Sequence, residues 1–131
     1  KQYNDRYGHQ AGDDCVRAIA ALIRQMESDQ IFCARYGGDE FVIIYSGMSA
    51  EEVCERAEKL RQDVMALQIE QRYTEGAFGV TISQGICHDI PSNGNKNWDF
   101  LHVADQTLYR VKRRGRNRLC MTDIHGREIE V

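Results

Sequence analysis

Two runs of β-prone residues, Ile31 to Tyr36 and Glu40 to Tyr45, flank the tripeptide Gly37-Gly38-Asp39. Glycine adopts the backbone conformations of tight turns at little cost, so this arrangement predicts an antiparallel hairpin with the glycines in the turn. Asp39 and Glu40 follow the glycines directly, and two carboxylates are therefore expected close to the tip of the hairpin. Helices from the rest of the chain are expected to cover the sheet to which this hairpin belongs.

Three segments carry apolar residues at helical spacing and predict the helices that provide this cover. The first helix is expected to run for about 14 residues, with Asp13 or Asp14 as its cap. A capping box at Ser49-Ala50-Glu51-Glu52 predicts the start of the second helix, and Gly115 is expected to stop the third. The apolar stripes are Val16, Ile19, Ala20, Ile23 and Met26; Val53, Ala57, Leu60, Val64 and Leu67; and Phe100, Val103, Ala104, Leu108 and Val111.

Two more strands are expected in the second half of the chain. Val80 to Ile86 alternates in the manner of a strand, Leu119 to Met121 resembles a last core strand, and His125-Gly126 is expected to turn the tail back as an edge strand. The resulting order of helices and strands predicts an α/β (α+β) sandwich in which helices cover one mostly antiparallel sheet. Neither a repeat nor a linker divides residues 1–131, so a single domain is expected.

Charge and hydropathy exclude several classes of protein. The 17 Lys and Arg against 20 Asp and Glu leave a formal charge of -3, which gives no general attraction to nucleic acid or acidic membranes. Six basic residues lie between Arg110 and Arg118, but no aromatic residues alternate with them to stack on bases, so nucleic-acid binding is not expected. The longest apolar run, Phe41 to Tyr45, is far shorter than the ~20 residues of a membrane span. We expect a cytoplasmic domain without membrane contact, although an upstream region could anchor a longer protein.

Cysteine usage points to a reducing compartment. The five cysteines are an odd number, they are widely separated, and they form no CxxC pair or zinc-like cluster. Reduced thiols that act as small core residues are therefore expected at Cys15, Cys33, Cys54, Cys87 and Cys120.

The acidic turn has two interpretations when it is considered alone. Its carboxylates are solvated in an ordinary turn, or they hold a hard cation such as Mg²⁺, which prefers one or two carboxylates together with phosphate oxygens of a substrate. Asp13 and Asn4 also allow a purely structural interpretation, because an Asp often caps a helix and an Asn in a loop often bonds to its own backbone.

Three separated segments resemble, in the same order, the motifs of one family. Residues 1–13 resemble the pattern FKxxNDxxGHxxGD without its first Phe, residues 35–41 match RYGGDEF at every position, and residues 104–117 resemble ADxxLYxxKxxGRN. The chain is similar to the GGDEF domain of bacterial diguanylate cyclases over nearly its whole length. This resemblance implies a ferredoxin-like fold of the nucleotidyl-cyclase type and a role in signal transduction, with a sensory domain upstream.

The resemblance also implies an activity. Two GTP molecules, one on each subunit of a homodimer, are joined into cyclic di-GMP with loss of pyrophosphate, and Mg²⁺ or Mn²⁺ is the cofactor. Gly37 and Gly38 match the signature loop, and Asp39 matches the acid that binds the catalytic metals. Glu40 matches its neighbour, which is either a further metal ligand or the proton acceptor for the attacking 3′-hydroxyl.

The remaining motif positions match residues that bind GTP. Asn4 and Asp13 match the residues that hold guanine, whose N1–H and exocyclic amine both donate to a carboxylate, whereas adenine presents an acceptor at N1. Lys1, Lys112 and Arg116 match positions that contact the triphosphate.

The chain departs from the family pattern in three places. The family carries another metal-binding Asp on an opening strand about five residues before the position of Lys1, and that strand is absent from this sequence, so the domain is expected to be N-terminally incomplete. Many of these cyclases bind their product at an RxxD motif, whose positions are occupied here by Ser28 and Ile31. Gln84 occupies a strand position that is commonly apolar.

These departures leave two alternatives to an active cyclase. The main one is a catalytically inactive GGDEF-type module that binds nucleotide for regulation, against which the intact acids of the turn argue. An adenylate or guanylate cyclase of related fold is the weaker one.

Overall fold

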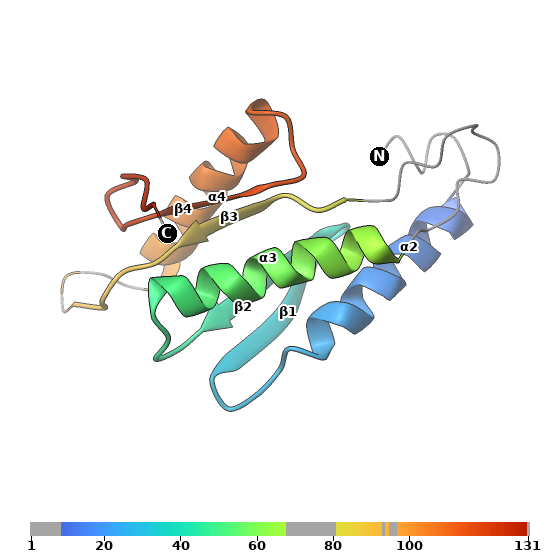
Figure 1. Ribbon diagram of the computed structural model, residues 1–131, viewed down its shortest axis with the longest axis horizontal. Helices are drawn as coiled ribbons and strands as arrows, with labels where there is room; N and C mark the ends of the chain where they lie inside the picture. The colour runs from blue at the N-terminus through green and yellow to red at the C-terminus, as the bar shows by residue number, and fades with distance from the viewer. Residues whose placement is uncertain (1–8, 68–80, 93, 95–96, 131) are drawn as a thin grey trace. The chain divides into compact units, whose positions relative to one another are not determined.

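The computed structural model describes residues 9–67, 81–92, 94 and 97–130, and these residues form helices and short strands (Figure 1). The elements follow one another in the order α2, β1, β2, α3, β3, α4 and β4. They belong to two compact units, the first within residues 1–48 and 62–80 and the second within residues 49–61 and 81–131. The mixture of helices and strands confirms the predicted α+β class.

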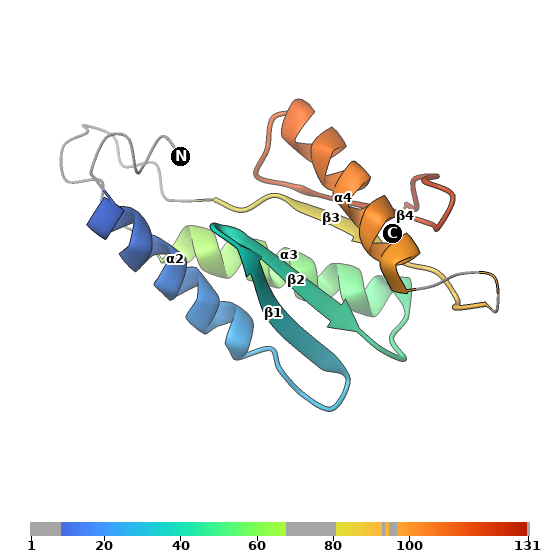
Figure 2. The ribbon, with the colours of Figure 1, turned by 180° about the vertical axis from the view of Figure 1, so that it is seen from behind.

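The first unit contains the hairpin. β1 (Ile31–Gly37) pairs antiparallel with β2 (Glu40–Tyr45), in a register that aligns Ile31 with Tyr45 and Arg35 with Phe41. Figures 1 and 2 both show α2 (His9–Arg24) beside this hairpin. The buried side chains of this region are Cys15, Ile19, Ile23 and Ile31. The hairpin predicted from the glycine turn is confirmed.

The start of α2 differs from the prediction. The helix begins at His9, so Asp13 and Asp14 lie inside it, and the prediction that one of them caps it is wrong. Gln10 and Ala11 have good helix propensity, and each residue added to an existing helix gains a hydrogen bond, so the helix extends beyond the apolar stripe.

The second unit begins with the start of α3 (Ala50–Ala66). The Ser49 hydroxyl oxygen accepts a hydrogen bond from the backbone N–H of Glu52 at 3.2 Å, and the same hydroxyl donates to the Glu52 carboxylate at 3.2 Å. This pair of contacts satisfies an otherwise unpaired amide of the first turn. The predicted helix start is therefore confirmed.

In the same unit, β3 (Gln84–Cys87) pairs with β4 (Leu119–Thr122) in parallel, and α4 (Asn97–Arg113) packs on both strands (Figure 2). A Cβ added to Gly85 would overlap the backbone nitrogen of Leu108 and lie 2.5 Å from the carbonyl oxygen of Ala104. Glycine is therefore required for this close approach of strand and helix. The described strands thus form one antiparallel and one parallel pair.

Two further expectations are settled in the second unit. The chain turns at Gly126, and Ile129 donates a backbone hydrogen bond of 2.8 Å to Met121, with a single antiparallel bridge between Thr122 and Glu128. The expected return of the tail is therefore present as a bridge. Gln84 also receives an explanation, because its side-chain amide donates to the Ala57 carbonyl at 2.8 Å and ties β3 to α3.

All five cysteines are free thiols, as predicted. Only Cys15 is buried, while the other four are half-buried, so most of them lie at the margin of the core. Among the helices of the described ranges, none is both long enough and apolar enough to cross a membrane.

Candidate functional site

The signature turn lies at the tip of the β1–β2 hairpin. Gly38 has a φ of 52°, in the left-handed region where a side chain is disfavoured, and the strand register shifts between Arg35 and Gly37. The Arg35 guanidinium donates to the Gly38 carbonyl through Nε at 2.8 Å and also through Nη2, which closes the turn from one side. Arg35 belongs to the quoted motif, but the sequence alone assigned no role to it.

This turn exposes both acids. Asp39 and Glu40 are exposed, and neither carboxylate forms a hydrogen bond or ion pair with any residue that the structure describes. Two adjacent hard oxygen donors facing solvent fit Mg²⁺, which usually retains several waters and takes its other ligands from substrate phosphates. No cluster of three potential metal-ligating side chains occurs within the described ranges, so the structure brings no third such residue to Asp39 and Glu40 there.

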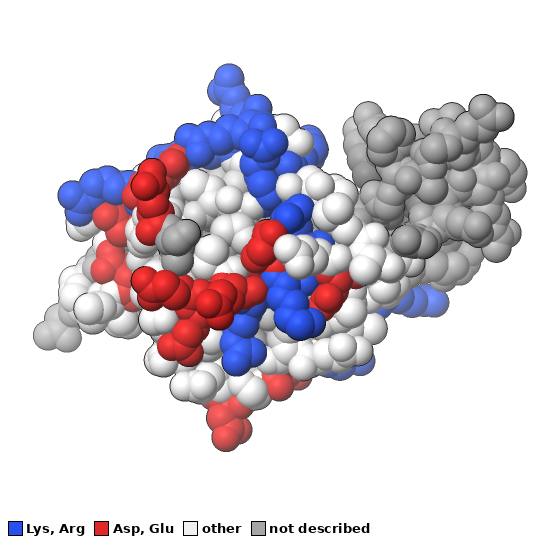
Figure 3. Space-filling view, viewed as in Figure 1, with Lys and Arg blue, Asp and Glu red and all other residues white. Residues whose placement is uncertain are grey.

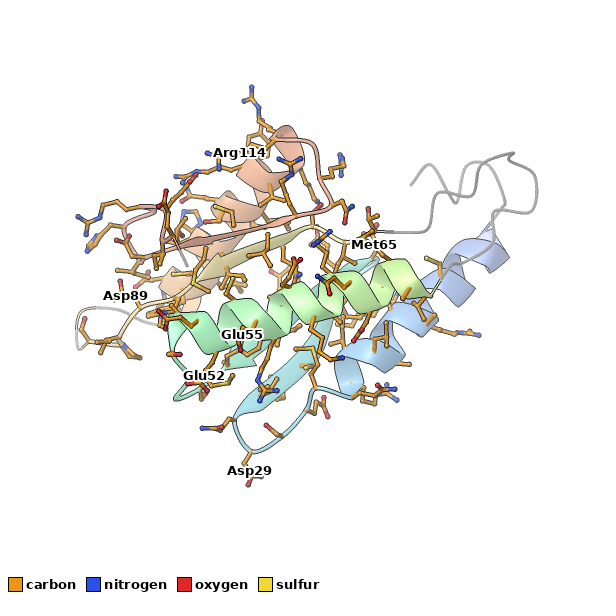
Figure 4. The ribbon with its side chains drawn as sticks, viewed as in Figure 1. Asp29, Glu52, Glu55, Met65, Asp89 and Arg114 are labelled. Carbon is orange, nitrogen blue, oxygen red and sulfur yellow. The ribbon has the colours of Figure 1, made fainter. Side chains whose placement is uncertain are left out.

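The cations predicted to bind phosphate lie at the end of α4 and just after it. Figure 3 shows Lys and Arg gathered over this end of the second unit, and Asp and Glu gathered over the first half of α3, where Figure 4 labels Glu52 and Glu55. The basic run consists of Arg110, Lys112, Arg113, Arg114, Arg116 and Arg118.

Four of these six side chains already have partners. Arg110 donates to the Gly126 carbonyl at 2.9 Å, and Arg114 forms a 2.6 Å ion pair with Glu128. Arg118 donates to the Arg116 carbonyl at 3.1 Å, and Arg113 lies 5.8 Å from the ring centre of Tyr109.

The other two are the residues that the family pattern selects. Lys112 and Arg116 are exposed, and their side chains form no hydrogen bond, ion pair or ring contact within the described part of the chain. Both charges are therefore available to an anion, and Arg and Lys form short, strong, charge-assisted hydrogen bonds to phosphate oxygens.

The predicted guanine and phosphate contacts near the N-terminus are only partly covered by the structure. Lys1 and Asn4 lie outside the described residues, and Asp13 is placed only as a member of α2. The acids of the turn belong to the first unit, whereas Lys112 and Arg116 belong to the second. The assignments of these seven residues therefore stay predictions.

The two positions of the missing product motif have structural roles instead. Ile31 is 3% exposed and starts β1, while Ser28 forms the tight turn before it, with backbone hydrogen bonds between the two residues in both directions. A pocket of about 330 Å³ lies at this turn and is lined in part by Asp29 and Gln30. Figure 4 labels Asp29 in the turn. Neither position presents the charge of the RxxD motif.

Comparison with known proteins agrees with this description. The family model "Diguanylate cyclase, GGDEF domain" matches residues 1–118, so the chain belongs to the GGDEF domain family. A diguanylate cyclase of Vibrio cholerae is 33% identical in an alignment of 127 positions that covers 92% of this chain and 36% of that protein. The uncharacterised protein YhcK of Bacillus subtilis is 34% identical over 124 residues, 94% of this chain and 34% of its own length.

Solved structures give the same result for the fold. The coiled coil and GGDEF domain of DgcB from Caulobacter crescentus, in complex with c-di-GMP, superposes with a TM-score of 0.81 at 34% identity, covering 92% of this chain and 63% of that one. The active GGEEF domain of a Vibrio cholerae diguanylate cyclase superposes with a TM-score of 0.71 at 33% identity, covering 90% and 72%. The chain spans about a third of the length of YhcK and of the Vibrio cholerae diguanylate cyclase to which its sequence was compared. The predicted family and fold type are confirmed.

Proposed function

We propose that this chain is the catalytic domain of a diguanylate cyclase, which converts two GTP into one cyclic di-GMP and two pyrophosphates. The observation that carries the proposal is the exposed Asp39-Glu40 pair without protein partners, in a turn that Arg35 holds, within a chain of the GGDEF family. The unpaired cations Lys112 and Arg116 add support, since the substrate carries a triphosphate.

The chemistry requires a 3′-hydroxyl to attack an α-phosphorus. A new P–O bond forms there, the bond from the α-phosphorus to the oxygen that bridges to the β-phosphate breaks, and pyrophosphate leaves. A divalent cation, when bound, supplies charge neutralisation at the α-phosphate. Asp39 binds this cation, and Glu40 either binds it as well or accepts the proton of the attacking hydroxyl.

The remaining residues bind and orient the substrate. Lys112, Arg116 and Lys1 contact the triphosphate, and Asn4 and Asp13 contact guanine. One GTP on each of two subunits forms the product, so we propose a homodimer as the active species. We also propose that the domain acts in the cytoplasm, under the control of an upstream sensory domain.

The test is turnover of GTP with Mg²⁺ or Mn²⁺, followed by mass spectrometry for cyclic di-GMP and by a colorimetric measurement of pyrophosphate. The family pattern places a further metal-binding Asp before the position of Lys1, so the assay uses the longest form of the protein that its gene encodes. We expect two pyrophosphates for each cyclic dinucleotide, and we expect EDTA to abolish both.

The main alternative is a GGDEF-type module that binds nucleotide without turnover. A folded protein that binds GTP but forms no cyclic dinucleotide, even at high protein concentration, would support that alternative and contradict the cyclase.

A further inference from the structure

The turn that carries Arg116 has an unusual backbone conformation. Three consecutive residues have positive φ: Gly115 at 116°, Arg116 at 64° and Asn117 at 47°. Asn tolerates this region better than most residues, whereas an Arg rarely occupies it. Such conformations persist only where the surrounding structure holds them in place. The contacts around this turn show what holds it.

Three contacts fix the backbone of the turn. The Arg116 N–H donates to the Val111 carbonyl at 3.1 Å, and the Asn117 N–H donates to the Ser83 hydroxyl oxygen at 3.2 Å. The Arg116 carbonyl in turn accepts the 3.1 Å hydrogen bond from Arg118. The peptide groups on both sides of Arg116 are therefore occupied, while its own side chain is exposed.

The side chain of Asn117 is held from a different helix. Arg61 of α3 donates through Nη1 to the Asn117 side-chain oxygen at 3.0 Å and, at 3.4 Å, towards the Asn117 carbonyl. The residues are 56 positions apart, so this contact ties the turn after α4 to the middle of the chain. Figure 4 labels Glu55 shortly before Arg61 on α3 and Arg114 shortly before the turn.

Glu58 orients Arg61 for this contact. Its two carboxylate oxygens accept from Nε and Nη2 of Arg61, each at 2.7 Å, which leaves Nη1 directed to Asn117. The Arg61 side chain is 19% exposed, whereas that of Glu58 is 39% exposed, so solvent reaches the glutamate side of the pair more than the arginine side. A lysine cannot replace this arrangement, because it lacks the planar fork that serves two partners at once.

We propose that Arg61, oriented by Glu58, is a positioning residue for the triphosphate of GTP. It holds Asn117, which keeps the Arg116 turn in its positive-φ conformation and the Arg116 guanidinium in place to meet phosphate. This role rests on the proposed function, in which Arg116 contacts the triphosphate. Arg61 itself touches no substrate.

The test measures the Kd of α,β-methylene-GTP with Mg²⁺, an analogue that cannot release pyrophosphate, on the longest encoded form of the protein. We expect Arg61→Gln to weaken binding about 10-fold, which is about 1.4 kcal/mol, and Arg61→Lys to restore little of it, because lysine lacks the planar fork that serves Glu58 and Asn117 at once. Arg56→Gln, an exposed position on the same helix, is the matched control and should bind as the wild type does. Guanosine, which lacks phosphates, should bind all variants equally.

A double-mutant cycle tests the route through Asn117. Asn117→Gly removes the side-chain acceptor while glycine tolerates the positive φ, so this variant keeps the turn accessible. If Arg61 acts through Asn117, the double variant binds the analogue about as weakly as either single variant. If the two fold-losses in affinity multiply instead, the two residues act independently and this route is overturned. If Arg61→Gln does not fold, Glu58→Gln replaces it in the binding measurements. This variant leaves Arg61 in place and removes the carboxylate that orients it.

The same measurements distinguish a failure of the role of Arg61 from a failure of the proposed cyclase function. A wild type that makes cyclic di-GMP, together with Arg61→Gln binding the analogue as tightly as the wild type, overturns the role of Arg61 and leaves the cyclase intact. Equal losses for guanosine and for the analogue also overturn it, because they indicate general damage to the fold. A wild type that binds no analogue overturns the proposed function and, with it, this role.

Discussion

The carboxylates of Asp39 and Glu40 lie at the tip of a hairpin, where neither forms a hydrogen bond or ion pair with a described residue. The conformation of the turn comes from its neighbours, namely the positive φ of Gly38 and the closing contact of Arg35. The proposed metal ligands, Asp39 and Glu40, are therefore different residues from Gly38 and Arg35, which set the conformation of the turn. This separation makes it possible to remove the acids without disturbing the strands.

Asp39→Ala tests this separation. We expect turnover to be lost, because a proposed metal ligand is removed, while the free energy of unfolding changes by no more than about 0.5 kcal/mol, as for other exposed substitutions. Product formation and urea denaturation measure the two quantities, with Asp29→Ala as an exposed control away from the turn. Activity comparable to the wild type would rule out Asp39 as a metal ligand.

Asp13 tests base selectivity. Its replacement by Ala removes the proposed partner of guanine N1–H and of the exocyclic amine. We expect this loss to weaken GTP binding by about 1 to 3 kcal/mol, which is about 5- to 150-fold in affinity. GTP binding should weaken while ATP binding improves, so selectivity falls from both sides.

The structure sharpens this test, because Asp13 lies inside α2 and a lost cap no longer competes as an explanation. Ala has the higher helix propensity, so the melting temperature should not fall. Affinities for GTP and ATP decide the outcome, with Asp14→Ala as the neighbouring control. Selectivity unchanged in Asp13→Ala would show that another residue recognises guanine.

At the scale of elements, the close approach of β3 and α4 depends on one glycine. Gly85→Ala would place a methyl group against the backbone of Leu108 and Ala104, which cannot move aside like a flexible side chain. We expect a loss of about 1–3 kcal/mol in the free energy of unfolding, measured by urea denaturation. Gly94→Ala is the control, since an added Cβ there meets nothing within 4 Å. Equal stability of both variants would contradict the tight packing.

The turn between α2 and β1 bears on product feedback. Ser28 and the buried Ile31 replace the charged residues of the RxxD motif, so we expect no noncompetitive inhibition by cyclic di-GMP at this surface. Progress curves with added product measure this. Noncompetitive inhibition at low product concentration that Ser28→Ala relieves would contradict the prediction. Inhibition that Ser28→Ala leaves unchanged would place a product site elsewhere.

At the scale of the whole molecule, the proposed reaction needs two GTP, one on each subunit. We expect the specific activity to rise with protein concentration until the dimer is fully formed, because dimerisation follows mass action. Initial rates over a dilution series, compared with the mass from light scattering, test this. A specific activity independent of concentration while the protein is monomeric would contradict the homodimer.

The sequence by itself determined the elements whose signals are local. The glycine turn predicted the β1–β2 hairpin, the capping box at Ser49 predicted the start of α3, and the three motifs identified the family. These signals depend on residues within a few positions of one another, where backbone propensities and side-chain caps act. The start of α2 was missed because the apolar stripe begins only at Val16, whereas the helix extends back through Gln10 and Ala11 to His9.

Only the tertiary structure decided the contacts between distant residues. The sequence offered no account of Gln84, which donates to Ala57, and no role for Arg61, which reaches Asn117. A Glu58–Arg61 spacing predicts an ion pair on a helix, but the direction of the third guanidinium nitrogen depends on which turn the fold brings beside it. Side-chain partners far apart in the chain are set by packing, and packing is a property of the folded molecule rather than of any local pattern.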